Sequence, residues 1–420
     1  MSAPTRTVAI EKLAPTGEGV ARTADGVGFV DRALPGEFVE TNVYEVRKRF
    51  WRGAVRSVRL PSPDRVGGPH ADCAGCDWSH FAVEPALGAK RELFLETLRR
   101  IGRLDRGEVG EVSIGRVSPP GYRLRTRLHV EGSELGYFAP GSHRVVPADL
   151  CEGIAENTRA LFPRVRAVLE MSDANVRELA ILESVDGARR LARATAEGDA
   201  GQAAGLGEGL ARLFDGVRVE STDGRSILTK GEAALPLEVG GRVFTISVDT
   251  FFQGNRHLVG DLYAAVAEDA RLAPPGEALD VFGGAGLFAG ALLDAGHRAT
   301  SVEGHEGAAA DARVTRESWA DRDRLETVEA SAVDFLADDD RRWTCVVADP
   351  PRAGLDVALA RELVRRTRNV FLYVSCDPAT LARDLSAILA EGFRIRHTRL
   401  LDLFAFTHRV EAIVTLERAA

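Results

Sequence analysis

The sequence predicts an α/β protein whose C-terminal part forms a mostly parallel, doubly wound sheet and whose N-terminal part forms a small β-barrel. Three observations support this fold class. From about residue 240, apolar strands alternate with helical stretches, as in doubly wound sheets. A glycine-rich loop comes after the first of these strands at residues 283–286. Within residues 1–60, short strands separated by Gly, Pro and Asp turns indicate a small closed barrel.

Length and composition limit the possible classes of protein. The chain has 420 residues, of which 45% are hydrophobic and 28% charged, which excludes wholesale disorder and suggests two or three domains. The net charge of −8 excludes a non-specific polyanion binder, so any contact with nucleic acid must come from a local basic surface. We expect a cytoplasmic protein with no membrane segment, because no apolar run is long enough and five cysteines at unpatterned spacing do not suggest a disulfide framework.

We expect three parts: the barrel at residues 1–60, a central α+β domain at 61–240 and a catalytic domain at 241–420. The barrel ends in a basic stretch, residues 47–59, interleaved with aromatic side chains. That pattern is typical of single-stranded nucleic-acid surfaces, although a charge-protected edge strand would look the same. In the central part, residues 155–215 are expected to be mainly helical.

Periodicity and turn residues predict further elements along the chain. The Gly/Ala-rich stretch at 196–208 is expected to be a loop. A helix is expected at about 85–101 and catalytic-domain strands near 278–282, 299–303, 344–348, 370–374 and 410–416.

The glycine loop of the catalytic domain is a candidate nucleotide site. Glycines such as Gly284, which comes shortly after Phe282, allow the backbone to approach a ligand at the carboxyl end of a strand. About twenty residues later, Glu303 ends the second strand, where a carboxylate usually binds a ribose diol. Alone, this pattern fits nicotinamide, flavin or S-adenosylmethionine, and Glu303 could also be a solvated strand end.

Three further positions are candidates for the chemistry. Asp349 ends the fourth expected strand and precedes two prolines, which make a rigid wall near the ligand crevice. Cys376 lies between an apolar strand and a turn, a placement suited to nucleophilic attack, although a packed strand-end cysteine is the alternative. Glu411 opens the last apolar strand and is either a general base or a solvated strand start.

These residues resemble the motifs of the RNA uracil-5-methyltransferase family. The resemblance rests on the segments Asp349-Pro350-Pro351-Arg352, Ser375-Cys376-Asp377-Pro378 and Val410-Glu411, and on Asp249-Thr250-Phe251-Phe252-Gln253, which matches a cofactor-site motif of the family. The N-terminal barrel is similar to the TRAM domain of the family members that make 5-methyluridine in 23S ribosomal RNA. The resemblance therefore implies a Rossmann-like S-adenosylmethionine-dependent methyltransferase domain, preceded by an OB-like TRAM barrel and a central domain.

The resemblance also implies roles for individual residues. Cys376 would attack carbon 6 of uracil and Glu411 would remove the proton from carbon 5. The implied cofactor-site residues are Gln253, Phe282, Gly284, Glu303 and Asp349, of which Asp349 would also hold the uracil edge. Ribosomal RNA is the expected substrate and transfer RNA the alternative, and we expect a monomer. A non-catalytic RNA-binding or folding factor is the rival from another class, disfavoured because Cys376 and Glu411 are both present.

Many family members hold a four-iron cluster, and here three of its four cysteine ligands are matched, by Cys73, Cys76 and Cys151. A glycine, Gly67 or Gly68, stands where the first cysteine is expected, although such clusters normally have four thiolates. The alternatives are a three-thiolate cluster completed by His70 or Asp72, an unstable cluster, a zinc site or no site. The sequence favours a retained or vestigial 4Fe-4S cluster.

Other departures from the family pattern are smaller. Asp377 replaces an Asn after the nucleophile, and Gly283 replaces a common Cys in the glycine loop. Arg409 stands where the family has a His two residues before the base, with His408 displaced by one. None of these changes removes the nucleophile, the base or the cofactor loop. The fifth cysteine, Cys345, is expected in the core.

Overall fold

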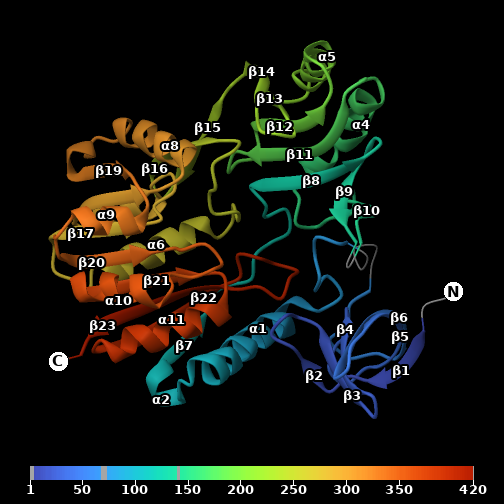
Figure 1. Ribbon diagram of the computed structural model, residues 1–420, viewed down its shortest axis with the longest axis horizontal. Helices are drawn as coiled ribbons and strands as arrows, with labels where there is room; N and C mark the ends of the chain where they lie inside the picture. The colour runs from blue at the N-terminus through green and yellow to red at the C-terminus, as the bar shows by residue number, and fades with distance from the viewer. Residues whose placement is uncertain (1–3, 68–72, 140–141, 420) are drawn as a thin grey trace.

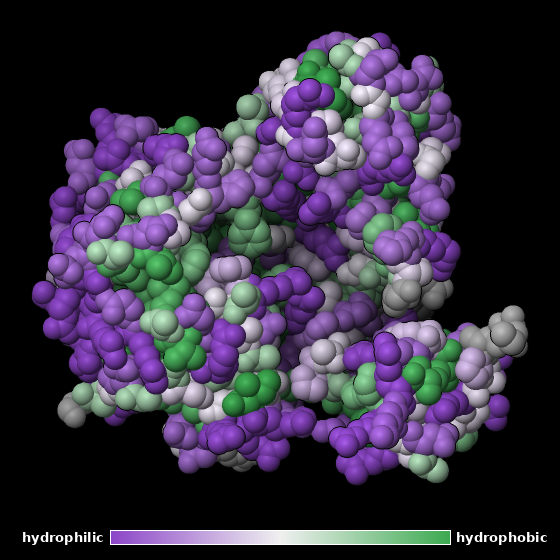
Figure 2. Space-filling model, viewed as in Figure 1, coloured by the Kyte–Doolittle hydropathy of each residue, from purple (hydrophilic) through white to green (hydrophobic). Residues whose placement is uncertain are grey.

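The computed structural model describes residues 4–67, 73–139 and 142–419. It contains three large sheets, which belong to an N-terminal barrel, a central lobe and a C-terminal lobe (Figure 1). The three lobes surround a hollow in which many hydrophilic residues are visible (Figure 2). Among the described residues, no helix is both long and apolar enough to span a membrane.

The N-terminal sheet has six strands in the order β1-β5-β6-β4-β3-β2, with β4 and β6 parallel and the other pairs antiparallel. It packs around Trp51, which is 1% exposed. Gly28 allows this packing, because a Cβ there would lie 2.2 Å from the Trp51 ring. The strands are β1 (Thr5–Ala9), β2 (Lys12–Leu13), β3 (Gly19–Thr23), β4 (Gly26–Asp31), β5 (Phe38–Val46) and β6 (Phe50–Leu60).

The central lobe is a seven-stranded sheet with the order β10-β9-β8-β11-β12-β13-β14. Helices α4 and α5 pack into the apolar cluster on one face of this sheet. Its elements are β8 (Arg125–Glu131), β9 (Glu134–Phe138), β10 (Val145–Pro147), α3 (Glu156–Arg159), α4 (Phe162–Glu170), β11 (Asn175–Glu183), β12 (Arg190–Glu197), α5 (Ala200–Leu210), β13 (Gly216–Ser221) and β14 (Ser226–Gly231).

Two sequence expectations for the central lobe are wrong. Residues 155–215 are not mainly helical, because they include β11 and β12, the antiparallel pair at the middle of the sheet. Strand β11 is buried along most of its length, so its apolar run lacks the alternation that marks a half-buried strand. The Gly/Ala-rich stretch forms the helix α5 rather than a loop, because Asp199 and Gln202 form a capping box at its start.

The C-terminal sheet has eight strands in the order β19-β18-β17-β20-β21-β23-β22-β7, parallel from β19 to β21. Helices cover both of its faces: α6 and α7 belong to one apolar cluster, and α1, α9, α10 and α11 to the other. Its strands are β7 (Glu111–Ile114), β17 (Glu277–Val281), β18 (Arg298–Glu303), β19 (Leu325–Glu329), β20 (Trp343–Ala348), β21 (Thr367–Ser375), β22 (Phe393–Leu401) and β23 (Glu411–Arg418). The helices are α1 (Val83–Thr97), which continues as a π-helical turn (Leu98–Gly102), α2 (Arg106–Val109), α6 (Val259–Ala270), α7 (Leu287–Asp294), α8 (Glu306–Glu317), a 3-10 turn (Arg322–Arg324), α9 (Ala332–Asp338), α10 (Val357–Arg366) and α11 (Pro378–Ala390).

Some elements lie across the expected domain boundaries. Helix α1 and strand β7 fall within 61–240, yet they pack on the C-terminal sheet, with Phe94 and Val112 in its apolar cluster. The hairpin of β15 (Ala234–Val239) and β16 (Arg242–Ser247) spans residue 240, and its apolar side chains join the core on the opposite face of that sheet. The division into 1–60, 61–240 and 241–420 as folding units stays a prediction.

Candidate active site

Cys376 and Glu411 lie next to each other at one end of the C-terminal sheet. Strands β21 and β23 are antiparallel, with Ser375 opposite Ala412, so the residue after Ser375 comes beside the residue before Ala412. Strand β20 is parallel to β21 on its other side and leads directly into Asp349. The sheet order therefore brings together three residues that the sequence singles out.

The local structure around Cys376 holds it between a strand and a helix. Asp377 is the N-cap of α11 and accepts hydrogen bonds from Ala379 N at 3.0 Å and Thr380 N at 2.9 Å. Ser375 Oγ accepts a bond from Asp377 N at 3.2 Å. Asp and Asn are equally good N-caps, so the replacement of the family's Asn by Asp377 preserves this turn.

The Cys376 thiol is partly buried among charges of both signs. Burial raises its pKa to about 11, and the carboxylates of Glu411 and Asp349 act in the same direction. Arg352 and Arg409 oppose this shift. The thiol is therefore protonated at neutral pH in the free protein, and its proton must leave before it can attack a carbon.

Glu411 is 2% exposed, and its Oε1 atom has no hydrogen-bond partner among the described residues. Burial raises the pKa of this carboxyl well above its ordinary value, and the nearby charge of Asp349 adds to the shift. An unpartnered buried carboxyl is costly to keep, which favours a task over a solvated strand start. A carboxyl with a raised pKa is suited to taking up and releasing a proton near neutral pH.

Asp349 connects this pair of residues to the glycine loop. Its Oδ2 accepts a hydrogen bond from Gln253 Nε2 at 2.7 Å. Burial raises the pKa of Asp349 to about 7, with a further contribution from the charge of Asp280. Asp349 is therefore hydrogen-bonded to Gln253 and close enough to Cys376 and Glu411 for its charge to act on both.

The glycine loop has an unusual backbone that opens space for a ligand. Phe282, Gly284 and Gly286 have φ values of 64°, 55° and 93°. A Cβ at Gly284 would meet nothing closer than 3.8 Å, so this turn is not filled by protein. Gly284 N donates to Glu303 Oε2 at 2.9 Å, which places the β18 carboxylate at the loop. These residues fit a nucleoside with a ribose diol, such as S-adenosylmethionine.

Two details of this loop were not expected from the sequence. Asp280, within β17, is fully buried, and burial raises its pKa to about 7. Its Oδ2 accepts bonds from Ala289 N at 2.9 Å and Ser301 Oγ at 3.2 Å, which tie β17 to α7 and β18. A Cβ at Gly283 would lie 2.0 Å from Ser301 Oγ, so this chain has space only for glycine where the family often has Cys.

Cys73, Cys76 and Cys151 form a second site in the central lobe, with their three Sγ atoms within 4.8 Å of one another. All three are buried, and Cys76 Sγ lies 3.7 Å from Cys151 Sγ. Hydrogen bonds from the other two thiols lower the pKa of Cys151 far below its ordinary value, and the buried Arg123 acts in the same direction. Arg123 Nη2 also donates to Gly75 O at 2.6 Å, within the turn between Cys73 and Cys76.

These thiols supply three ligands to a metal or cluster, which is one short of the usual four for a 4Fe-4S cluster. Of the two remaining cysteines, Cys345 is buried inside β20, as expected, and Cys376 lies beside Glu411 in the C-terminal sheet. His70 and Asp72, the candidates for a fourth ligand, lie outside the described residues. A complete four-cysteine set therefore does not fit this chain.

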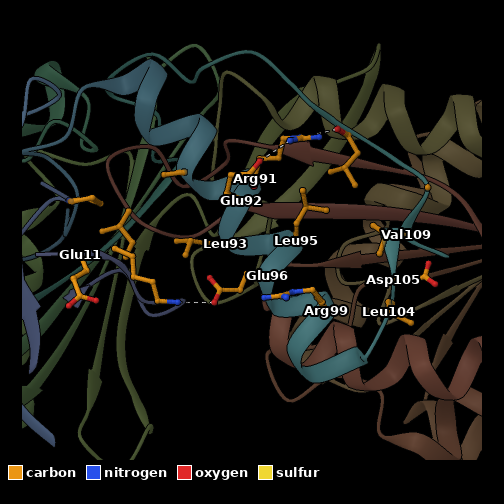
Figure 3. Close-up of a pocket in the computed structure, with 16 residues that line it drawn as sticks. Glu11, Arg91, Glu92, Leu93, Leu95, Glu96, Arg99, Leu104, Asp105 and Val109 are labelled. Carbon is orange, nitrogen blue, oxygen red and sulfur yellow. Dashed lines mark hydrogen bonds and ion pairs between the residues drawn. The ribbon is translucent and has the colours of Figure 1, made fainter. Parts of the chain in front are cut away.

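A groove of about 810 Å³ lies between the barrel and α1, away from the catalytic residues (Figure 3). Apolar side chains such as Leu93 and Leu104 alternate on its walls with charged ones. Lys12 Nζ donates to Glu96 Oε1 at 2.9 Å across the groove and connects the barrel to α1. None of the described residues that line the groove is Cys376, Glu411 or a residue of the glycine loop.

Comparison with known proteins identifies the family. A TRAM domain matches residues 4–55, and tRNA (Uracil-5-)-methyltransferase matches residues 331–419. The chain is 32% identical to the 23S rRNA (uracil(1939)-C(5))-methyltransferase RlmD of Halomonas elongata, with 98% of this chain and 89% of the relative covered. The chain belongs to the RNA uracil-C5-methyltransferase family.

Other similar proteins cover the chain equally well. An uncharacterized RNA methyltransferase of Streptomyces avermitilis is 31% identical and is covered over 98% of both chains. The fold matches the crystal structure of the Pyrococcus abyssi tRNA (uracil-54, C5)-methyltransferase in complex with S-adenosyl-L-homocysteine. That match has a TM-score of 0.80 and 24% identity, over 98% of this chain and 99% of the other. The expected fold class, a methyltransferase domain preceded by a TRAM barrel, is confirmed.

Proposed function

We propose that this protein methylates carbon 5 of a specific uridine in 23S ribosomal RNA through a covalent adduct between Cys376 and the base. The observation that carries the proposal is the juxtaposition of Cys376 and the buried Glu411 on neighbouring strands, next to the cofactor loop. A methyltransferase that modifies an exocyclic amine needs no such cysteine. The proposal includes the catalytic roles of these two residues and the cofactor-binding roles of the loop.

Cys376 starts the reaction by making carbon 5 nucleophilic. Its thiolate forms a bond to carbon 6, and the π electrons of the 5,6 double bond move through carbon 4 to the O4 oxygen, giving an enolate. Because the free thiol has a raised pKa, its proton passes to a neighbouring carboxylate as the base enters. Asp349 takes this proton, which leaves Glu411 unprotonated for the later step. Arg352 and Arg409 stabilise the anionic sulfur.

Glu411 ends the reaction. Gln253, Phe282, Gly284 and Glu303 would hold S-adenosylmethionine, which would supply an electrophilic methyl group to carbon 5. Once carbon 5 carries both the methyl group and its original proton, the carboxylate of Glu411 removes the proton. The electrons of that C–H bond re-form the 5,6 double bond, and the Cys376 thiolate leaves. Burial suits Glu411 to this step, because a buried carboxylate with an oxygen that accepts no hydrogen bond is more basic than a solvated one.

The substrate proposal rests on the barrel as well as on the relatives. The β5–β6 turn of the barrel carries three consecutive exposed cations, Arg47, Lys48 and Arg49, and Tyr44 beside them is 48% exposed. Cations and an exposed aromatic ring suit phosphates and unstacked bases, respectively. The target uridine must leave its stack to reach Cys376, as for other enzymes that act on nucleobases. Two relatives that match nearly the whole chain are named as acting on 23S ribosomal RNA.

Transfer RNA is the second candidate substrate, because the fold also matches an enzyme named for tRNA uracil-54. The test is incubation of unmodified ribosomal and transfer RNA with a methyl-labelled donor, and then mapping of the labelled nucleotide. We expect 5-methyluridine at one site of 23S ribosomal RNA. Label in transfer RNA alone would overturn the ribosomal assignment, and label on an exocyclic amine, or none with the wild-type protein, would overturn the covalent mechanism.

A further inference from the structure

We infer that Asp77 and His408 form a positioning link, through which the loop that carries Cys73 and Cys76 holds the catalytic base in place. Two segments are involved: residues 73–81, called the cysteine loop, and residues 402–410, called the catalytic connection because they lead from β22 into Glu411. The inference rests on the proposed role of Glu411 and assigns to Asp77 and His408 a function in proton removal.

The catalytic connection is a loop that joins the paired ends of β22 and β23. Leu401 at the end of β22 pairs with Glu411 at the start of β23, so the intervening residues leave the sheet and return to the same point. They extend from the red C-terminal sheet toward the start of α1 (Figure 1). Because these residues have no strand partners within the described chain, contacts with other segments must determine their conformation.

The first half of the catalytic connection is held by buried groups. Lys90 of α1, which is 3% exposed, donates to Asp402 Oδ1 at 2.5 Å and to Phe404 O at 3.1 Å. Asn255, two residues after Gln253, donates through Nδ2 to Leu403 O at 3.0 Å. This half therefore joins α1 to the cofactor-side loop and is part of the packed interior.

The second half is held by the cysteine loop. Trp78 N donates to Phe406 O at 2.9 Å. The residue before it, Asp77, accepts a hydrogen bond from His408 N at 3.3 Å through Oδ1 and pairs with His408 Nδ1 through Oδ2. Asp77 comes directly after Cys76. One peptide bond and the Asp77–His408 hydrogen bonds therefore link the buried thiol site to the catalytic connection.

The barrel also contacts both the cysteine loop and the catalytic connection, through Gly17. Trp78 Nε1 donates to Gly17 O at 2.9 Å, and the His408 ring packs on Gly17. Gly17 has a φ of 93°, and a Cβ there would lie 2.7 Å from His408 Cβ. His408 is thus the point where the barrel, the cysteine loop and the catalytic connection meet.

This junction bears on the chemistry because His408 is joined in the chain to two residues of the active site. Arg409, the next residue, is one of the two cations that lower the pKa of Cys376, and Asp77 is among the charges that act on Arg409. Glu411 comes two residues after Arg409, and its Oε1 has no hydrogen-bond partner among the described residues. The orientation of this carboxyl group therefore depends on the position of its backbone. A displacement of about 1 Å at a reacting group can cost about 100-fold in rate.

The Asp77–His408 pair is the part of this junction that can be tested without unfolding the protein. The Lys90–Asp402 pair is almost fully buried, so removing either partner would leave an uncompensated charge inside. The side chains of Asp77 and His408 are 43% and 23% exposed, and they tolerate substitution better. Asp77→Ala and His408→Ala remove the link, whereas Asp77→Asn retains an oxygen that can accept from His408 N.

The experiment compares these variants with Glu96→Gln, which removes the negative charge from the Lys12–Glu96 ion pair, a different contact between the barrel and α1 (Figure 3). For each full-length variant we measure kcat and KM with RNA, the melting temperature, and the fraction of protein bound covalently to RNA on denaturing gels. We expect Asp77→Ala and His408→Ala to lower kcat about 10- to 100-fold at unchanged KM. The covalent fraction should rise, because proton removal becomes slower than thiol attack. Asp77→Asn should recover most of the rate, and Glu96→Gln should match the wild type.

The outcomes separate this inference from the proposed function. If Asp77→Ala keeps the wild-type kcat, or loses rate without accumulating adduct, the positioning role is overturned. A rise in KM together with the same loss in Glu96→Gln would also overturn it, because it would indicate general loosening of the barrel. The proposed function fails instead if the wild type makes no 5-methyluridine and Glu411→Gln traps no adduct.

Discussion

The two cysteine sites of this protein differ in where they lie and in what surrounds them. Cys73, Cys76 and Cys151 are buried in an apolar cluster with Arg123 nearby, and Cys151 accepts hydrogen bonds from the other two thiols. Cys376 is partly exposed at a strand end, between two carboxylates and two arginines. Both are thiol sites with shifted pKa values, but the charges of Glu411 and Asp349 help to raise the pKa of Cys376, whereas hydrogen bonds from Cys73 and Cys76 lower the pKa of Cys151.

A shifted pKa alone does not identify a nucleophile. In the central lobe, the low pKa of Cys151 arises because two other thiols donate to it, which suits a metal or a stable core. At the sheet end, the raised pKa of Cys376 arises because burial and carboxylates oppose its charge. The second arrangement keeps a neutral thiol that is activated only when a substrate changes its surroundings.

The largest effect is expected from Cys376→Ala. The variant should lose more than about 10³-fold in methyl transfer, because no other group can attack carbon 6. RNA binding should survive, since the basic turn of the barrel is unchanged. The measurement is incorporation of labelled methyl groups, together with a filter-binding assay. Equal loss in Cys151→Ala at unchanged stability would break the comparison between the two sites.

Glu411→Gln comes next. Replacing the base should slow turnover by about 10²- to 10⁴-fold, because the amide cannot take the carbon 5 proton. The variant should also accumulate a covalent protein–RNA adduct, since the thiolate cannot leave until that proton does. Denaturing gels with labelled RNA detect the adduct. A variant that turns over slowly without any adduct would move the base role to another residue, with Asp349 as the first to test.

A smaller, purely structural effect is expected from Cys151→Ala. Truncating this fully buried thiol should lower the free energy of unfolding by about 1–3 kcal/mol, because it leaves a small cavity and deprives two thiols of their acceptor. Cys376→Ala should change it by about 0.5 kcal/mol or less, because that side chain is partly exposed. Urea unfolding of both variants tests the contrast, and equal losses would contradict it.

Much of the catalytic lobe was predictable from the sequence because its signals are local. The glycine loop, the Asp349 turn and the strand before Cys376 each lie within a few residues, and the order of strands in a doubly wound sheet brings their ends together. The adjacency of Cys376 and Glu411 has the same origin. Strands β19 and β22 were missed. Strand β19 is short and lies at the edge of the sheet, and β22 has no continuous apolar run like those of the central strands, although its alternation of apolar and charged residues is itself a signal of a half-buried strand.

The features that the sequence could not provide depend on contacts between distant segments. Lys90 and Asp402 are 312 residues apart, and neither belongs to a motif. Asp77 and His408 are 331 residues apart, and although each stands beside a motif, neither motif predicts that they pair. Asp280 had a local signal, since it precedes the glycine loop, but its burial depends on Ser301 in the next strand. Helix α5 was missed because glycine has a low helix propensity and α5 contains several glycines. The capping box at its start was the one local signal for a helix.

The smallest effect tests the charges around Cys376. Arg409→Gln removes a cation that lowers the pKa of this thiol, so the pKa should rise further above its ordinary value, by about one unit or less. At about pH 9, which is below the pKa in both proteins, the thiolate fraction falls as the pKa rises, so alkylation by iodoacetamide should be slower in the variant. Glu411→Gln removes an opposing anion, and its alkylation profile should therefore shift to lower pH. Opposite shifts in the two variants would establish that local charge controls this thiol; shifts in the same direction would show that a change in burial controls it instead.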